Sequence, residues 1–536
     1  MLLAGCVEGP LSVDDDDATP IDLDDDDSAG CEEPGPAGDD LVYTTVGPLQ
    51  GVAVPGGWGF LGVPFAQAPT DERRWTAPEP PVCDPQVRPA QTLGPRCPQL
   101  ADGVLTGDED CLQLNVWTPE LGAPDEPRPV LFFVHGGGHI QGSTRETIAG
   151  SDALLYDGGR VVRAADVVVV TANYRLGALG YLAHPALGDE DGGRSGNYGL
   201  LDLLEALRWV RANIAAFGGD PDRVLLFGES AGATNVCALM TSPAAEGLFS
   251  AALMESGGCG GATLALEEQA GVVWAEELGC ADAADVANCL RQVPADDLAA
   301  LSSDVASNGI MGGGGFGPVV DGVVLPELPQ RALEGGRQHD VPLVVGANED
   351  ETATLLGPMS EAAYNAAVAT IFQTRASEVL AQYPPEDFAS PRWAWIALTS
   401  DAQFLCPARR IARAADASQS APVHRYFFTL APSGAAGPEL GAFHGLELLY
   451  VFQGLDAVAE ATGYSITDED RAVQLETLRH WTRLAAGRDL DDPSQAVPWP
   501  TLGGLEDRHL EFGPEIRAGA GVRSDYCDFW DDLFGP

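Results

Sequence analysis

The segment that most constrains this chain is the G-x-S-x-G pattern from Gly228 to Gly232, with Ser230 at its centre. It follows the apolar run at residues 224–227 and precedes a helix-compatible stretch at residues 233–240. A strand, a sharp turn and a helix in this order hold the serine in a strained backbone conformation, with its hydroxyl above the end of a parallel sheet. Glycines flank the serine because side chains there would collide where strand and helix crowd together. We therefore predict a nucleophilic serine. The alternative is an ordinary glycine-rich loop that ends a buried strand.

A second glycine-rich turn lies upstream, where the apolar residues 129–134 run directly into residues 135–138, with the sequence HGGG. A nucleophilic serine needs hydrogen-bond donors for the negative charge that forms on the attacked carbonyl oxygen. In an HGGG-type loop the backbone N–H groups supply them, together with the amide of the residue after the nucleophile. The three predicted donors are the N–H groups of Gly137, Gly138 and Ala231.

The serine also needs a base and an acid that orients the base, and in α/β hydrolases both follow the serine, with the acid first. Five of the eight histidines lie after Ser230. His444 stands out among them, because it precedes a helical run at residues 446–452 and the glycine after it permits a turn that reaches the serine. His135 and His139 belong to the glycine turn, and we expect them to shape it without transferring protons.

The acid is harder to choose. A strand expected at residues 342–345 ends in the run at residues 346–351, where Glu349, Asp350 and Glu351 compete. Runs of charge are normally solvated faces, so the pattern alone leaves all three open.

Five further segments complete an ordered set of motifs over about residues 42–527. They are residues 60–66 (FLGVPFA) with Arg73, Arg74 and Trp75, residues 109–117 (EDCLQLNVW), residues 173–175 (NYR), residues 197–202 (NYGLLD) and residues 217–221 (FGGDP). Together with the two glycine turns they resemble the type-B carboxylesterases, a family that includes bacterial esterases, cholinesterases and the non-catalytic neuroligins. The resemblance implies an α/β-hydrolase fold, with a central, mostly parallel sheet flanked by helices and a nucleophile elbow.

The resemblance also implies roles for single residues. The family's acid falls on Glu351, although Thr352 stands where the family has glycine, and its H-G-x-E segment makes His444 the base. Glu229 matches an acidic residue beside the nucleophile that tunes the field near the developing charges. Ser256 matches a serine that supports the triad from behind; a polar strand end is the alternative for this residue.

These parts predict a serine carboxylesterase that works through an acyl-enzyme intermediate. We expect no cofactor and no metal, because the glycine-rich residues 312–315 lack a phosphate-loop pattern and no Cys/His cluster has zinc spacing. The alternatives are a lipase, another acyl hydrolase such as a thioesterase or amidase, and a neuroligin-like binding protein with vestigial activity.

The expected substrate is a small-molecule ester with a short- to medium-length acyl chain. Residues 312–318 lie near the acyl pocket that the resemblance implies, with Phe316 as one apolar wall. A surface loop without this role is the alternative. Residues 98–110 contain no aromatic side chain, which argues against a cholinesterase, because the family's choline-binding tryptophan would be expected there.

The chain is strongly acidic, with a formal net charge of −51 from 80 acidic and 29 basic residues, and all 29 are arginine. This charge disfavours partners such as nucleic acid and anionic lipid surfaces. The length of 536 residues is expected to hold one large catalytic domain at residues 41–536.

The N-terminus is expected to be separate from that domain. Residues 1–5 resemble the remnant of a signal peptide, and Cys6 ends an LAGC sequence that resembles a bacterial lipobox, which predicts lipidation and membrane attachment at this cysteine. Residues 6–40 include two runs of four aspartates and predict a disordered acidic tether, with calcium binding as the alternative. We expect an exported protein, held at the outer membrane or cell surface as a lipoprotein, or otherwise periplasmic or secreted.

Ten cysteines remain after Cys6, an even number that suits an oxidising compartment. The resemblance implies three disulfides, namely Cys97–Cys111, Cys280–Cys289 and Cys406–Cys527. The pairing of the other four is a guess, Cys237 with Cys259 and Cys31 with Cys83. Reduced cysteines packed as small apolar residues are the alternative.

Overall fold

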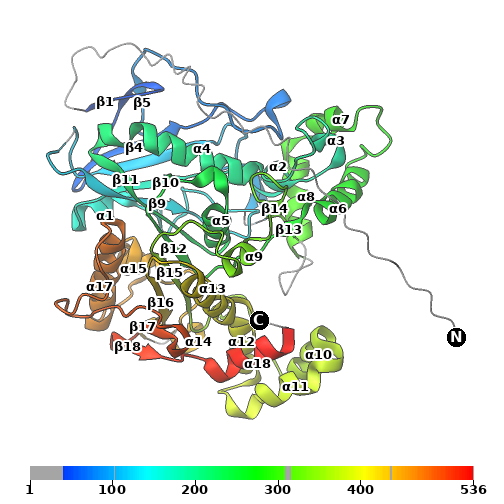
Figure 1. Ribbon diagram of the computed structural model, residues 1–536, viewed down its shortest axis with the longest axis vertical. Coiled ribbons are helices and arrows are strands. Elements are labelled where there is room, and N and C mark those ends of the chain that lie inside the picture. The colour runs from blue at the N-terminus through cyan, green and yellow to red at the C-terminus, as the bar shows by residue number, and fades with distance from the viewer. Residues whose placement is uncertain (1–39, 102, 123, 308–314, 435–436, 535–536) are drawn as a thin grey trace.

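A large, mostly parallel sheet runs through the computed structural model, which describes residues 40–101, 103–122, 124–307, 315–434 and 437–534 (Figure 1). In these residues eleven strands form it. The strands from β17 to β10 run parallel to their neighbours, and antiparallel strands add to both edges. In spatial order they are β18 (Arg517–Ala520), β17 (Arg508–Phe512), β16 (Val423–Phe428), β15 (Leu343–Asn348), β12 (Ala251–Glu255), β11 (Gly219–Glu229), β9 (Arg128–Val134), β10 (Val168–Ala172), β8 (Gln113–Thr118), β4 (Gly57–Pro64) and β3 (Val52–Val54).

The middle strands are apolar throughout because helices cover both faces of the sheet. In β11, Val224 and Leu226 point to one face, and Leu225 and Phe227 point to the other. The first face packs on α4 (Tyr198–Asn213), α5 (Ala231–Met240) and α13 (Cys406–Ser418). The second packs on α1 (Gly158–Ala164), α15 (Leu448–Val451) and α17 (Asp468–Ala485). This layered architecture agrees with the predicted fold class.

Two groups of helices lie beyond the sheet (Figure 1). One contains α6 (Leu264–Glu277), α7 (Val286–Gln292) and α8 (Ala295–Ser307). The other, drawn in yellow-green and red, contains α10 (Glu361–Phe372), α11 (Ala376–Gln382), α12 (Pro391–Ser400) and α18 (Ser524–Phe534), which share a small aromatic core. The shorter helices are α2 (Gly177–Tyr181), α3 (Pro185–Gly188), α9 (Pro329–Glu334), α14 (Gly437–Leu440) and α16 (Leu455–Thr462).

Short strands pair outside the main sheet. They are β1 (Leu41–Thr44) with β2 (Gly47–Gln50) and β5 (Arg88–Pro89), β6 (Gln99–Ala101) with β7 (Val104–Thr106), and β13 (Ala262–Thr263) with β14 (Val319–Val320). No helix of the described residues combines the length and the apolar composition needed to cross a bilayer.

The strands expected near the two glycine turns and the acidic run correspond to β9, β11 and β15. The helix after Ser230 begins earlier than expected, at Ala231, because the elbow turn is complete within one residue. The helical run expected at residues 446–452 is only one turn of α-helix, α15.

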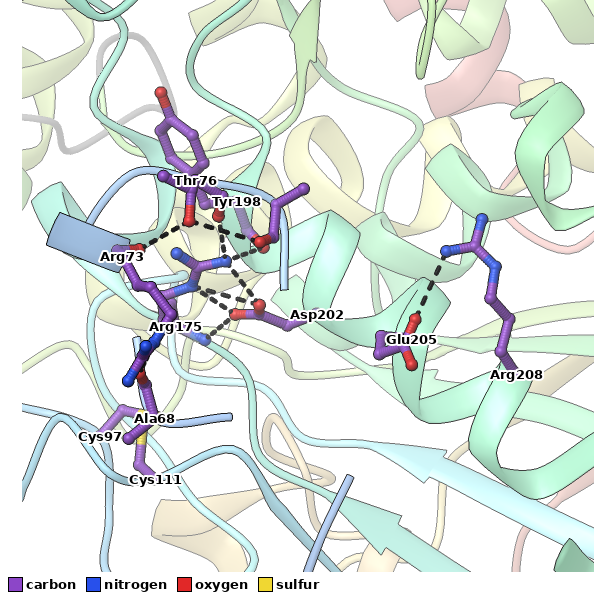
Figure 2. Close-up of polar contacts among 11 residues, drawn as sticks. Ala68, Arg73, Thr76, Cys97, Cys111, Arg175, Tyr198, Asp202, Glu205 and Arg208 are labelled. Carbon is purple, nitrogen blue, oxygen red and sulfur yellow. Dashed lines mark hydrogen bonds and ion pairs between the residues drawn. A yellow bond between two sulfur atoms is a disulfide. The ribbon is translucent and has the colours of Figure 1, made fainter. Parts of the chain in front are cut away.

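Two of the sequence motifs are joined by a buried ion pair (Figure 2). The Arg175 guanidinium donates to both carboxylate oxygens of Asp202, with the shortest N–O distance 2.7 Å, and both side chains are almost fully buried. Arg175 also donates to the backbone oxygen of Thr76 at 3.0 Å and lies over the ring of Tyr198. Because the motif at residues 173–175 precedes α2 and that at residues 197–202 opens α4, this contact ties the two helices together.

Disulfides join the cysteine pairs that the resemblance implies, and the guessed pair Cys237–Cys259 is also bonded. In the described residues the bonds are Cys97–Cys111, Cys237–Cys259, Cys280–Cys289 and Cys406–Cys527. Cys83 is disulfide-bonded as well. The guessed partner Cys31, the expected lipidation site Cys6 and the expected tether lie outside the described residues.

Candidate active site

Ser230 occupies the sharp turn between β11 and α5. Its backbone has φ 56° and ψ −121°, a conformation that residues with a side chain rarely adopt. Its N–H donates to the carbonyl oxygen of Glu255 at the end of β12, at 2.8 Å. A β-carbon at Gly232 would overlap the carbonyl oxygen of Val134, so glycine is required where helix and strand meet. The predicted elbow geometry is therefore present.

The HGGG loop lies directly against this turn. A β-carbon at Gly136 would lie 3.0 Å from Cβ of Ser230 and would overlap the carboxylate of Glu229. Among the hydrogen bonds of the described residues, none uses the N–H of Gly137 or Gly138. The N–H of Ala231 belongs to the first residue of α5, where a helix has no internal acceptor for it. The three predicted donors thus have N–H groups that an incoming oxyanion could accept from.

Glu351 and His444 meet side by side, as the resemblance implies. The His444 Nδ1 lies 2.6 Å from Oε2 of Glu351, and Oε1 of the same carboxylate accepts from the N–H of Asn348 at 2.8 Å. The carboxylate is fully buried. Its neighbour Asp350 points elsewhere and accepts from the N–H of Ala442 at 3.1 Å, which leaves Glu351 as the carboxylate that reaches the imidazole.

The other imidazole nitrogen faces a second carboxylate. The His444 Nε2 lies 3.1 Å from Oε1 of Glu229, and in the described part of the chain no hydrogen bond joins it to the Ser230 hydroxyl. Burial disfavours the imidazolium, but the carboxylates of Glu229 and Glu351 outweigh burial and raise the pKa of His444. Burial also raises the pKa of Glu229, which the imidazolium opposes. Sequence reasoning placed Glu229 near the developing charges but missed this direct contact with the base.

His135 and His139 both lie buried beside the glycine loop. His135 stacks on the ring of Tyr174, and His139 contacts the side-chain oxygen of Asn235 at 3.2 Å. Burial lowers the pKa of each histidine to about 4, so both are neutral near pH 7. Their contacts are those expected of residues that shape the loop.

Two aromatic side chains lie close to these groups. Phe316 is buried against Trp274, with ring centroids 4.7 Å apart, and the next residue, Gly317, is close to the His139 ring. Phe404 packs on the ring of His444 at 4.9 Å, a contact that sequence reasoning did not anticipate. It is presented by a π-helical turn at Asp401–Leu405, between α12 and α13. Such turns are frequent at functional sites.

Ser256 lies directly after β12, on the inner side of the elbow. Its N–H donates to the carbonyl oxygen of Gly346 in β15 at 2.9 Å. Its hydroxyl is buried and lies beside the phenol of Tyr426. The structure thus places Ser256 behind the elbow, and its supporting role stays a prediction.

Comparisons with known proteins agree with this geometry. The sequence pattern of the Carboxylesterase family matches residues 38–530. A para-nitrobenzyl esterase of Bacillus subtilis (strain 168) is 34% identical over 473 residues, which cover 86% of this chain and 92% of that protein. A fumonisin B1 esterase of Sphingopyxis macrogoltabida is 34% identical over 480 residues, covering 86% of this chain and 84% of that protein. The solved structure of a thermophilic pNB esterase has a TM-score of 0.79 and 32% identity, and the match covers 92% of this chain and all of that one.

The likeness to the solved esterase confirms the α/β-hydrolase fold, and the matched residues span nearly all of the described chain. The sequence pattern and the related esterases agree on one chemistry, the hydrolysis of carboxylic esters. This chain belongs to the carboxylesterase family and is a carboxylic ester hydrolase.

Proposed function

We propose that the chain hydrolyses its ester through an acyl-enzyme on Ser230, with His444 as the base and Glu351 as the acid that orients it. His444 Nε2 takes the proton of the serine hydroxyl as the oxygen attacks the ester carbonyl carbon. Glu351 holds the proton on Nδ1 and stabilises the imidazolium that forms. The imidazolium then protonates the departing alkoxide, and the alcohol leaves.

Water completes the cycle by the same route. His444 removes a proton from water as the oxygen attacks the acyl-enzyme, and returns it to Ser230 when the acid product departs. In both halves the oxyanion accepts hydrogen bonds from the N–H groups of Gly137, Gly138 and Ala231. Removing a single oxyanion-hole donor costs about 3–4 kcal/mol of transition-state stabilisation.

The observation that carries the proposal is the 2.6 Å contact between His444 and the buried Glu351. The base must exchange its 3.1 Å contact with Glu229 for one with the Ser230 hydroxyl when substrate binds. Catalytic hydrogen bonds often align only in the substrate complex.

The proposed substrates are small esters with short to medium acyl chains. Phe316 and Trp274 form a buried aromatic pair next to the loop that would hold the oxyanion, and this wall limits the room for the acyl group. The B. subtilis relative is described as a para-nitrobenzyl esterase, which makes para-nitrophenyl esters suitable first probes.

The proposed location is outside the cytoplasm, with Cys6 as a lipid attachment site. Disulfides persist mainly in oxidising compartments, and four are formed within the described residues. Mass spectrometry of the protein isolated from its own cells tests this location. A diacylglyceryl group on Cys6 supports it, and an exported chain without a lipid on Cys6 would contradict the lipid anchor.

The decisive experiment is hydrolysis of para-nitrophenyl esters of increasing acyl length by the wild type and Ser230→Ala. We expect turnover to fall by about 10⁴- to 10⁶-fold in the variant, with an unchanged circular dichroism spectrum. Ser420→Ala, at an exposed serine after α13, is the matched control and should retain full activity. A folded Ser230→Ala protein that keeps most of its turnover would contradict the role of Ser230 as the nucleophile.

A further inference from the structure

Four buried glutamates lie in or next to the site: two of them contact the His444 imidazole, and the other two act electrostatically on these. They are Glu229 at the end of β11, Glu255 at the end of β12, Glu351 after β15 and Glu447 before α15. None of the four is more than 5% exposed. Within the described residues none of them pairs with an arginine, and the sequence contains no lysine.

This arrangement is unbalanced in charge. If all four were ionised, four buried carboxylates would share a single imidazolium. An ionised carboxylate without a counter-charge costs several kcal/mol when it is buried, and the group takes up a proton instead. Carboxyl groups that share one buried site therefore hold protons at a pH at which isolated ones would not.

The hydrogen bonds indicate which carboxyls those are. Glu351 and Glu229 each contact a nitrogen of His444, so the imidazolium compensates them. Glu255 and Glu447 have no such contact. Glu255 Oε1 accepts from the Trp481 indole at 3.0 Å, and Glu447 Oε2 accepts from the Asn348 side chain.

The second carboxyl oxygen of each of these two glutamates is left without a hydrogen-bond partner in the described part of the chain. These oxygens, Glu255 Oε2 and Glu447 Oε1, are buried. A buried acceptor left unpaired is costly, but a proton turns one of two neighbouring carboxyls into a donor.

We propose that Glu255 and Glu447 are neutral carboxylic acids at pH 7, and that their protons keep His444 able to act as a base. The second half of this inference rests on the proposed function; the first does not. Glu447 is then a positioning residue, because it holds Asn348, whose N–H holds the Glu351 carboxylate.

The groups that act on this pair are the two carboxylates that contact His444 and neighbouring neutral phenols. The pKa of Glu255 is raised by burial and by Glu447 and Glu229, and the pKa of Glu447 is raised by burial and by Glu229 and Glu351. The phenols that interact with the pair belong to Tyr426 and Tyr156, and burial raises the pKa of both. Among the described groups that act on the pair, His444 is therefore the only one that can carry a positive charge. It cannot compensate two further carboxylates.

The protonation states matter for the base. A negative charge on either glutamate would stabilise the imidazolium and hold the proton that His444 must give up before it can accept one from Ser230. A single nearby charge shifts a pKa by roughly 1–2 units at an effective dielectric constant of about 20. When Glu255 and Glu447 are neutral, they do not raise the pKa of His444 in this way.

The test compares the infrared spectra of the wild type, Glu255→Gln and Glu447→Gln at pH 7. Glutamine keeps the shape and removes the titration. We expect each variant to lose a band of a protonated carboxyl group, whereas the control Glu334→Gln, at a surface ion pair, should lose a carboxylate band. Loss of a carboxylate band from both active-site variants would overturn the proposal.

The pH dependence of kcat/KM gives the second readout. The apparent pKa on the acidic side of the kcat/KM–pH profile, called the acid limb, should move by less than about 0.5 unit in both glutamine variants, because no charge is removed. A fall of about 1–2 units would show that the glutamates are ionised and would overturn the proposal. The infrared result needs no esterase activity, so it remains decisive even if the proposed mechanism fails, and either variant suffices if the other does not fold.

Discussion

Ser230 and Glu351 of the proposed triad follow strands β11 and β15, His444 lies in the loop between α14 and α15, and a backbone contact fixes each of the three. Ser230 is held through its N–H by the carbonyl oxygen of Glu255 at 2.8 Å. The N–H of His444 donates to the carbonyl oxygen of Glu351 at 3.2 Å, so base and acid are joined through the main chain as well as through their side chains. Contacts of this kind fix the backbone of each residue and leave its side chain free for chemistry.

Glu229 sets the pH at which the base becomes available. Its carboxylate raises the pKa of His444, and the base works only when it is neutral, so the charge moves the acid limb of kcat/KM to higher pH. Removing the charge in Glu229→Gln should therefore lower the apparent pKa of this limb by about one unit. Measuring kcat/KM from pH 5 to 10 checks the shift.

The exposed Glu506→Gln is the matched control for this change and should leave the limb where it is. An acid limb that stays in place or moves upward in Glu229→Gln would show that the contact with His444 does not control the base.

Phe316 should restrict the length of the acyl chain. It is 4% exposed and packs on Trp274, so Phe316→Ala opens space beside the expected acyl position. We expect the ratio of kcat/KM for octanoyl over butanoyl esters to rise by about tenfold. Phe529→Ala, in the distant aromatic core around α18, is the control for general loosening. An equal rise in both variants would argue against a wall at Phe316.

The site was predictable from the sequence where its parts are close in the chain. Gly137, Gly138 and Ser230 belong to local patterns whose backbone geometry follows from their neighbours. The residue pattern alone left Glu351 open, because which of three adjacent carboxylates reaches the histidine depends on the turn after β15, and only the family resemblance selected it. The contact between Phe404 and His444 was invisible, because it depends on a π-helical turn that leaves no pattern in the sequence.

The elements that carry the site are locked by buried polar contacts as well as by apolar packing. The ion pair of Arg175 and Asp202 joins the loop before α2 to the first turns of α4, as Figure 2 shows. Replacing either partner leaves the other charge buried without compensation.

Asp202→Asn should therefore lower the free energy of unfolding by about 3–5 kcal/mol, measured by urea denaturation. The control is Glu334→Gln, which removes a surface pair with Arg331, and we expect a loss below about 0.5 kcal/mol there. A loss in Asp202→Asn as small as in the control would mean that the pair contributes little to holding α2 and α4 together.

The sheet could be predicted in its centre and not at its edges. β9, β11 and β15 are continuous apolar runs because both of their faces are covered, and such runs stand out in a sequence. β3 and β18 are short and partly exposed strands, and nothing in their composition separates them from loops. The small helical core around α18 was also missed, because its aromatic residues come from distant parts of the chain.

The molecule as a whole carries a large negative charge, and its sequence contains arginine but no lysine. Many arginines are paired locally with acids, for example Arg128 with Asp166 and Arg291 with Glu190. The 80 acidic residues far outnumber the 29 arginines, so the excess charges repel one another across the surface.

Screening should therefore stabilise the folded protein. The Debye length falls from about 30 Å at 0.01 M salt to about 8 Å at 0.15 M. We expect the melting temperature to rise by several degrees, about 3–8 °C, over this range of sodium chloride. Differential scanning calorimetry measures the rise, and potassium chloride at equal ionic strength should reproduce it. A flat or falling melting temperature would show that repulsion does not limit stability.

The spacing of the disulfides sets an order of assembly. Cys97–Cys111, Cys237–Cys259 and Cys280–Cys289 close loops of 14, 22 and 9 residues and can form while the chain is still being made. Cys406–Cys527 spans 121 residues and must wait for the last helix. His444 lies inside that loop, so the disulfide that closes the segment with the base forms last of these four. A nascent chain with these three bonds complete already contains the elbow and the glycine turn, but not yet the closed segment that holds the base.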